Sequence, residues 1–159
     1  MDKKGRVSIP ASFRRVLEAG DPNWMSGQTP EFVIVYGDHR RDYLECYTIA
    51  AIEEVEEQIE ELPRGSQERR ILERIFTGLS TTATVDDTGR IVLTQMLREK
   101  IGVPADSEAF FIASGDTFQI WNPTTYDEVE KSRVDEYLDA LPPDVDPLTL
   151  LPEKRKRED

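Results

Sequence analysis

Two stretches of this sequence, DKKGRVSIPASFR at residues 2–14 and DDTGRIVLTQMLR at residues 86–98, align without a gap. An aspartate, a glycine, two arginines and the apolar strand positions recur in the same order in both. Each copy is followed by an apolar run that ends in Gly-Asp, FVIVYGD at residues 32–38 and FFIASGD at residues 110–116. Self-similarity over this length indicates a duplicated structural unit, and it is the strongest signal in the chain.

Each copy opens with a pattern typical of a tight turn that presents an arginine. In Asp-x-x-Gly the aspartate side chain accepts hydrogen bonds at the start of the turn, and the glycine at its end is free to take a positive φ. Arg6 and Arg90 therefore follow directly after a rigid reversal of the chain. The predicted turn-forming residues are Asp2, Gly5, Asp86 and Gly89.

The residues after each turn predict a strand and then a short helix. Apolar and other residues alternate at 7–9 and 91–93, as in a strand with one buried face. Suitable helix starts are Pro10, at a first helical position, and Thr94, as an N-cap; suitable helix ends are Gly20 and Gly102. We expect each half to run strand, short helix, hairpin, helix.

Two longer helices are predicted between the halves. Apolar residues three or four apart at 52–62 end at Pro63, and Ser66 can cap a second apolar stripe that ends before Gly78. We expect both helices to cover faces of the sheet. Six glutamates at 53–61 are interpreted as a solvated helix face rather than as a surface for a partner protein.

The composition excludes several classes of protein. The chain has 159 residues, and its 32 acidic and 20 basic side chains give a net charge of −12, which excludes a uniformly cationic nucleic-acid coat. Its longest apolar runs, at 32–36 and 109–113, are far shorter than the roughly 18 residues that span a bilayer, so we expect no membrane segment. A single cysteine and no signal-like apolar segment favour a cytoplasmic location.

The sequence predicts no cofactor, no metal site and no enzyme. One histidine and one cysteine cannot supply the roughly four ligands of a Cys/His zinc site. Nucleotide-binding loops and the nucleophile elbow are missing. Cys46 and His39 form a conceivable nucleophile pair, but a buried strand cysteine and a loop histidine are favoured. An acidic hydrolase, which needs converging carboxylates, is the least favoured hypothesis.

Positive charge is concentrated near the start of the chain. Residues 1–17 hold five basic side chains against one acidic one, whereas residues 53–61 hold six glutamates and no basic residue. A basic edge on an acidic body can bind duplex DNA, because localised lysines and arginines release the counterions of the phosphates. Basic clusters of this size are also common on surfaces without a ligand. The second copy is less basic, so we expect it to make fewer phosphate contacts.

On the duplicated motif at residues 2–14 and 86–98, the chain resembles the MraZ family over nearly all of residues 2–141. That family comprises bacterial transcriptional regulators with two SpoVT-AbrB modules, each with an Asp-x-x-x-Arg signature. The resemblance implies an α+β fold in which two AbrB-like swapped-hairpin β modules form a pseudo-twofold β-barrel flanked by helices. The implied parts are modules at 1–50 and 80–124, linking helices at 51–79, a C-terminal helix at 125–143 and a flexible tail at 144–159.

The resemblance also implies a function. It predicts a sequence-specific DNA-binding regulator, a repressor of the division and cell-wall gene cluster, located in the cytoplasm with the nucleoid. The implied partners are double-stranded promoter DNA with direct repeats and further copies of the chain in a ring-shaped, octamer-like homo-oligomer. The signature arginines, Arg6 and Arg90, receive the DNA contact. Further DNA-binding candidates are Lys3, Lys4, Arg14, Arg15 and Arg98.

The alternative function is that of an AbrB-like antitoxin or a protein-binding assembly scaffold. Antitoxins of this kind generally carry one module and a disordered tail that binds the toxin. Two modules in one chain and a short tail therefore argue against this alternative.

The start of the chain departs from the family pattern. Family members normally carry an initial strand before the first signature, and the second copy keeps such a strand at residues 78–85. Here the first signature begins at Asp2. Either the start is assigned downstream of the true one or the first copy is truncated. In the second case we expect unpaired strand edges in the first module.

Overall fold

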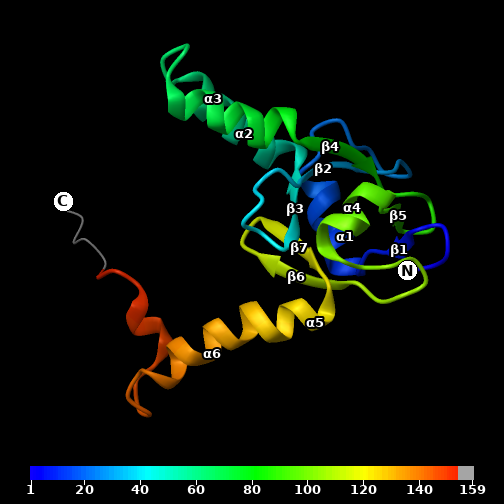
Figure 1. The fold of residues 1–159 in the computed structure, drawn as a ribbon. Helices are drawn as coiled ribbons and strands as arrows, with labels where there is room; N and C mark the ends of the chain where they lie inside the picture. Colours follow the sequence, from blue (N-terminus) through cyan, green and yellow to red (C-terminus); the bar gives the residue numbers. More distant parts are fainter. Residues whose placement is uncertain (154–159) are drawn as a thin grey trace. The chain divides into compact units, whose positions relative to one another are not determined.

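The computed structural model describes residues 1–153 and divides the chain into two compact units, Met1–Pro123 and Thr124–Asp159. The secondary structure is mixed, with antiparallel sheets and helices (Figure 1), which confirms the predicted α+β class.

The first unit contains the duplicated order of strand, short helix and hairpin, and in the first half the hairpin is followed by a helix. The first half comprises β1 (Arg6–Ser8), α1 (Ala11–Ala19), β2 (Glu31–Val35), β3 (Tyr43–Thr48) and α2 (Ile49–Glu60). The linking segment continues with α3 (Gln67–Glu73) and the π-helical turn η1 (Arg74–Gly78). The second half comprises β4 (Ser80–Thr84), β5 (Arg90–Val92), α4 (Gln95–Ile101), β6 (Phe110–Ser114) and β7 (Thr117–Trp121).

The strands form two sheets, and both sheets mix strands from the two halves. β1 pairs with β5 in a two-stranded ribbon, and the other strands lie in the order β4-β2-β3-β7-β6. Over residues 1–153 this larger sheet is open, with β4 and β6 as its outer strands, and no barrel closes. β4 belongs to the second half but pairs with β2 of the first, while no described strand lies on the corresponding outer side of β6.

The strand register is unchanged when the two halves are exchanged. In the ribbon Arg6 faces Val92 and Ser8 faces Arg90, so the pairing is symmetric about the Val7–Ile91 pair. In the larger sheet Leu44 faces Ile120 and Cys46 faces Phe118, which is symmetric about the pair of Glu45 and Gln119. An internal twofold therefore relates the two copies of the motif.

The hairpins of the two halves match with a shift of one residue from the sequence alignment. The internal twofold relates Tyr47 to Trp121. Val33 faces Tyr47 and Phe110 faces Trp121, so Phe110 corresponds to Val33, whereas the sequence alignment matches it with Phe32. The shift arises because the first hairpin loop, residues 36–42, is longer than the second, which holds two residues. A shift of one residue matters, because it exchanges the two faces of a strand.

The main core lies between the ribbon, the larger sheet and the two short helices. Aromatic rings connect these layers: Phe13 of α1 stacks on Phe118 with ring centroids 5.2 Å apart, and Phe32 lies 5.9 Å from Phe118. A second cluster forms where Ile52 of α2 packs on Val33 and Val35. The linking helix α2 thus covers one face of the sheet at its first turn, as predicted. The same prediction is wrong for α3, which has no buried residue; only Ile75 and Phe76 of the following turn η1 pack on this cluster. The glutamates that follow are mostly exposed.

The helix ends largely follow the predicted capping residues. Thr94 and Ser66 accept hydrogen bonds from the backbone at the starts of α4 and α3, and Gly102 ends α4 with φ +65°. Pro10 differs from its prediction, because it lies at the N-cap of α1, one residue before the helix, and makes no side-chain cap. Gly20 ends α1 with φ −92°, so this position does not depend on positive φ.

The second unit is helical where it is described. It contains α5 (Pro123–Thr125), which begins at the last residue of the first unit, and then η2 (Tyr126–Lys131), α6 (Ser132–Asp139) and the 3-10 turn η3 (Pro147–Leu150). The charged end of the predicted tail, 154–159, lies outside the described residues. Among the residues that are described, none of the helices is both long and apolar enough to span a membrane.

We expect the Ile34→Ala variant to lower the free energy of unfolding by about 2–5 kcal/mol, because Ile34 is fully buried in the main core and its truncation leaves a cavity. Urea denaturation followed by circular dichroism measures the loss. The control is Met25→Ala at an exposed position, for which a change within about 0.5 kcal/mol is expected. Equal changes in the two variants would contradict the assignment of this core.

Candidate nucleic-acid interface

The two signature segments form the same tight turn. The backbone N–H of Gly5 donates to the carbonyl oxygen of Asp2 over 3.1 Å, and that of Gly89 donates to Asp86 over 3.0 Å. The two glycines have φ +79° and +78°, values that a side chain disfavours. The sequence pattern of an aspartate followed three residues later by glycine therefore corresponds to one backbone geometry in both halves.

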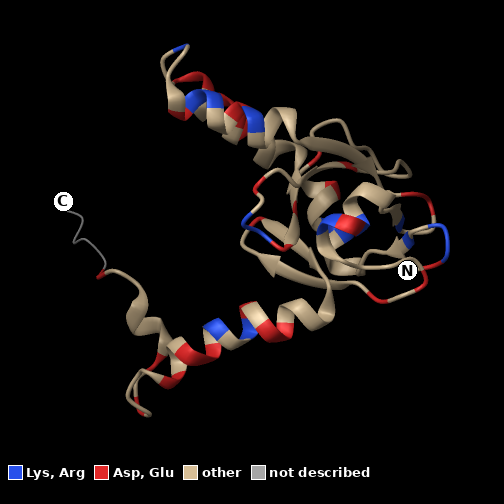
Figure 2. Cartoon of the chain, viewed as in Figure 1, with Lys and Arg blue, Asp and Glu red and all other residues tan. Residues whose placement is uncertain are grey.

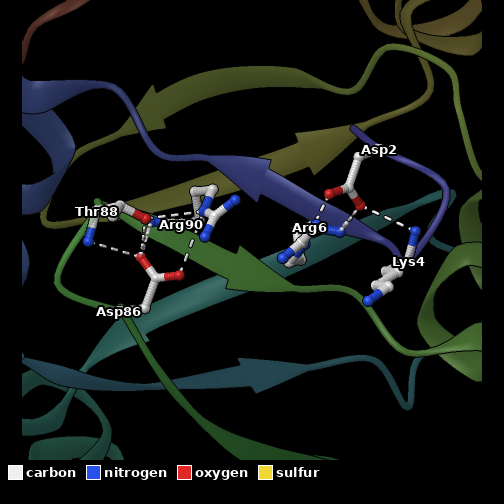
Figure 3. Close-up of polar contacts among 6 residues, drawn as sticks. All are labelled: Asp2, Lys4, Arg6, Asp86, Thr88 and Arg90. Carbon is white, nitrogen blue, oxygen red and sulfur yellow. Dashed lines mark hydrogen bonds and ion pairs between the residues drawn. The ribbon is translucent and has the colours of Figure 1, made fainter.

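Each turn aspartate binds both the turn backbone and the signature arginine (Figure 3). Asp2 Oδ1 accepts from the backbone N–H of Lys4 and of Arg6, each over 2.9 Å, and Oδ2 accepts from Arg6 Nε over 2.7 Å. The aspartate thereby fixes the turn and the first N–H group of the guanidinium together.

The second turn repeats this arrangement and adds a threonine. Asp86 Oδ1 accepts from the backbone N–H of Thr88 and of Arg90, over 3.0 and 2.8 Å. Arg90 Nε lies 3.3 Å from Asp86 Oδ2 and donates to Thr88 Oγ1 over 2.8 Å, as Figure 3 shows. The role of Thr88 was missed by sequence reasoning, although its place inside the signature was the available signal.

These hydrogen bonds keep the turn carboxylates ionised. The backbone N–H of Arg6 lowers the pKa of Asp2 below its ordinary value of 3.8, and the backbone N–H of Arg90 lowers the pKa of Asp86 in the same way. Because the folded pKa values are depressed, their contribution to stability is present above pH 3.8 and is lost as the pH falls through the lower folded values. At neutral pH both guanidinium groups therefore have an anionic anchor.

The two signature arginines lie on one exposed face of the ribbon. Val7 and Ile91 of β1 and β5 point into the core, so their neighbours in each strand point outward. The side chains of Arg6 and Arg90 are 37% and 35% exposed. Within residues 1–153 both are held through Nε alone, which leaves the two terminal amino groups of each guanidinium available to a ligand.

Positive charge is unequal at the two turns. Lys3 and Lys4 are exposed in the first turn, and the exposed Arg15 lies on α1. At the equivalent places the second turn carries Asp87 and Thr88. Figure 2 shows this difference as a blue loop beside the N-terminus. The first turn with its arginine is therefore net basic, and the second is not.

Comparison with known proteins places this arrangement in a family. A scan against protein-family models finds no match. The chain is 66% identical to the transcriptional regulator MraZ of Ruegeria sp. (strain TM1040) over 95% of its length and 89% of that protein. The chain belongs to the MraZ family. It is also 64% identical to MraZ of Ruegeria pomeroyi and 47% identical to MraZ of Cereibacter sphaeroides, with at least 89% of each protein covered.

Membership in the MraZ family confirms the family resemblance and the prediction of a transcriptional regulator rather than an enzyme. It also favours the regulator over the antitoxin or scaffold alternative, since these relatives are named as transcriptional regulators.

Cys46 is fully buried, and burial raises the pKa of its thiol well above the usual value, whereas His39 is exposed. Residues 1–153 contain no cluster of histidine, cysteine and carboxylate ligands for a metal ion.

The two signature turns of this MraZ family member are bound to each other's halves. The carbonyl oxygen of Gly5 accepts from the backbone N–H of Leu93 over 2.9 Å, and that of Gly89 accepts from Ile9 over 2.9 Å. Each bond extends the ribbon ladder beyond its strand residues. Neither turn is therefore held by its own half alone.

Arg14 and Arg98 cover the turn glycines of the opposite halves. The guanidinium of Arg98 lies against Gly5 and donates to the carbonyl oxygen of Leu93 over 2.6 Å, and the guanidinium of Arg14 lies against Gly89. Both glycines are buried, and both arginines are partly buried. The DNA-binding candidates thus separate into outward groups and these two covering groups. The recurrence of a glycine and an arginine at one spacing in both copies was the only sequence signal for the second role.

We expect Gly5→Ala to destabilise the protein by about 2–5 kcal/mol, because strain at positive φ adds to crowding of the new Cβ. That Cβ would lie 2.5 Å from the backbone oxygen of Leu93, which cannot move without breaking the ribbon. The matched control is Gly27→Ala, which has φ +86° but open space, and for which only the strain of about 1–2 kcal/mol is expected. Equal losses on urea denaturation would show that the turn is not crowded.

Proposed function

We propose that the protein binds double-stranded promoter DNA through the outer face of the β1–β5 ribbon. The observation that carries this proposal is that Arg6 and Arg90 share this exposed face and are held only through their Nε groups, Arg6 by Asp2 and Arg90 by Asp86 and Thr88. A two-stranded ribbon fits the major groove, where an arginine fork can donate two hydrogen bonds to O6 and N7 of guanine. Preorganised forks lose less side-chain entropy on binding.

The remaining basic residues divide into two proposed roles. Lys3, Lys4 and Arg15 are exposed and fix the position of the protein through phosphate contacts, which carry no sequence information. Arg14 and Arg98 add positive charge behind the ribbon and hold the turns in place. The acidic remainder of the chain limits indiscriminate binding to DNA.

The family resemblance supports a more specific regulatory role. We infer that the chain represses the division and cell-wall gene cluster and acts at the nucleoid as a ring-shaped, octamer-like homo-oligomer. Several protomers would then bind consecutive direct repeats, and each contact would raise the effective concentration of the next. Repeat spacing thereby becomes part of recognition.

We also propose that residues 1–50 and 80–124 are two interlocked AbrB-like swapped-hairpin modules that together make a pseudo-twofold barrel-like body. The symmetric register of the β1–β5 and β3–β7 pairs supports this proposal. In this view residues 51–79 are linking helices, 125–143 form a C-terminal helix and 144–159 form a tail.

The test of the interface is the Arg6→Ala variant in a band-shift assay with repeat-bearing promoter DNA. Loss of one bidentate base contact is expected to weaken binding by about 5- to 150-fold. Arg64→Ala, at an exposed arginine between α2 and α3, is the control and should bind as the unmodified protein does. Unchanged affinity of Arg6→Ala would remove this arginine from the interface.

A second test separates phosphate contacts from base contacts. In Lys4→Ala we expect weaker binding to all duplexes alike, with the slope of log K against log salt reduced by about 1, because one phosphate contact is lost. Titrations at several salt concentrations with fluorescence anisotropy measure the slope. A loss confined to one DNA sequence, or a slope near zero for the unmodified protein, would contradict phosphate binding.

A further inference from the structure

The outer face of the ribbon carries one apolar side chain between its arginines. Val92 of β5 is 55% exposed, faces Arg6 across the ribbon and lies two residues along the strand from Arg90. Its neighbour Ile91 is buried, so Val92 projects on the outer side. A single exposed valine is common on protein surfaces, but this one is one of the four outward residues of the ribbon and neighbours both signature arginines.

The first half has a serine at the corresponding position. Ser8 is exposed, faces Arg90 across the ribbon and lies two residues from Arg6. The internal twofold therefore superposes two arginines on each other but superposes a valine on a serine. The backbone of the face is symmetric, and its chemistry is not.

We propose that Val92 contacts the C5-methyl group of a thymine next to the guanine bound by Arg6, and that Ser8 makes a polar contact at the equivalent place beside Arg90. This inference rests on the proposed function. Cβ atoms of cross-strand partners lie about 4.5–5.5 Å apart, which lies between one and two base steps of about 3.4 Å. The thymine methyl is the one apolar group that a base presents in the major groove.

The valine and the serine give each protomer a direction on DNA. A face with exact twofold chemistry would bind both halves of a palindrome equally, as symmetric dimers do. Val92 favours a thymine on one side of the axis alone, and the excess of lysines at the first turn lies at one end of the same face. Both differences select one orientation of the protomer, which suits repeats that all run in the same direction.

The experiment uses a duplex that the full-length protein selects from a random-sequence pool. Each thymine of the selected repeat is replaced in turn by uracil, which lacks only the C5-methyl group, and affinity is measured by fluorescence anisotropy. We expect uracil to weaken binding by about three- to fivefold at one position per repeat, the effect of about one buried methyl group. In the Val92→Ser variant the thymine and uracil duplexes should bind equally.

Two controls accompany these measurements. Val134→Ser changes an exposed valine of the second unit and should keep the full preference for thymine. Ser8→Val should create a second uracil-sensitive position in a duplex that carries a thymine at the place equivalent to that of the Val92 contact, and circular dichroism checks that each variant is folded.

The possible failures are distinguishable. If a repeat is selected but no uracil substitution weakens binding, or if Val92→Ser keeps the preference, the inference about Val92 is overturned while the proposed function stands. If no sequence is selected, the proposed function fails and the inference fails with it.

Discussion

One hydrogen bond joins each signature turn to the opposite half, and these two bonds are the constraint on which the rest of the structure depends. Gly5 and Gly89 offer their carbonyl oxygens to Leu93 and Ile9, and this exchange completes a ribbon that neither half can form alone. The buried side of the ribbon then closes the main core, and its outer side is left for a ligand. The folding step that forms the ribbon therefore also places the two arginines on its outer face.

The geometry of the turns explains how an acidic chain can have a selective basic surface. Asp2 holds the Nε–H group of Arg6, and Asp86 with Thr88 holds that of Arg90, so the distal fork of each arginine is left exposed. The carboxylates partly offset the positive charge of the arginines, so directional hydrogen bonds count for more than net charge. The lysines of the first turn add attraction that does not depend on sequence. In the proposed interface, selectivity and affinity thus reside in different residues of the same loop.

The repeat allowed most of the secondary structure and both signature turns to be predicted, because turn chemistry, strand alternation and helix caps are local properties. The contacts that each half makes with the turn of the other half could not be predicted from the sequence. Arg14 and Arg98 read as surface cations, yet each covers a glycine of the other half. The one-residue shift between the hairpins depends on loop length, which an alignment on Gly-Asp conceals. Cross-pairing between distant copies leaves no periodicity in either copy.

The axis through Val7 and Ile91 has an evolutionary consequence. If two identical half-length chains paired about that axis, any mutation in their shared surface would alter the same residue in both chains. Fusion into a single polypeptide lifts this restriction, because a mutation then alters one copy and spares its twin. Ser8 and Val92 show the divergence that a fused gene permits while the scaffold under them is preserved.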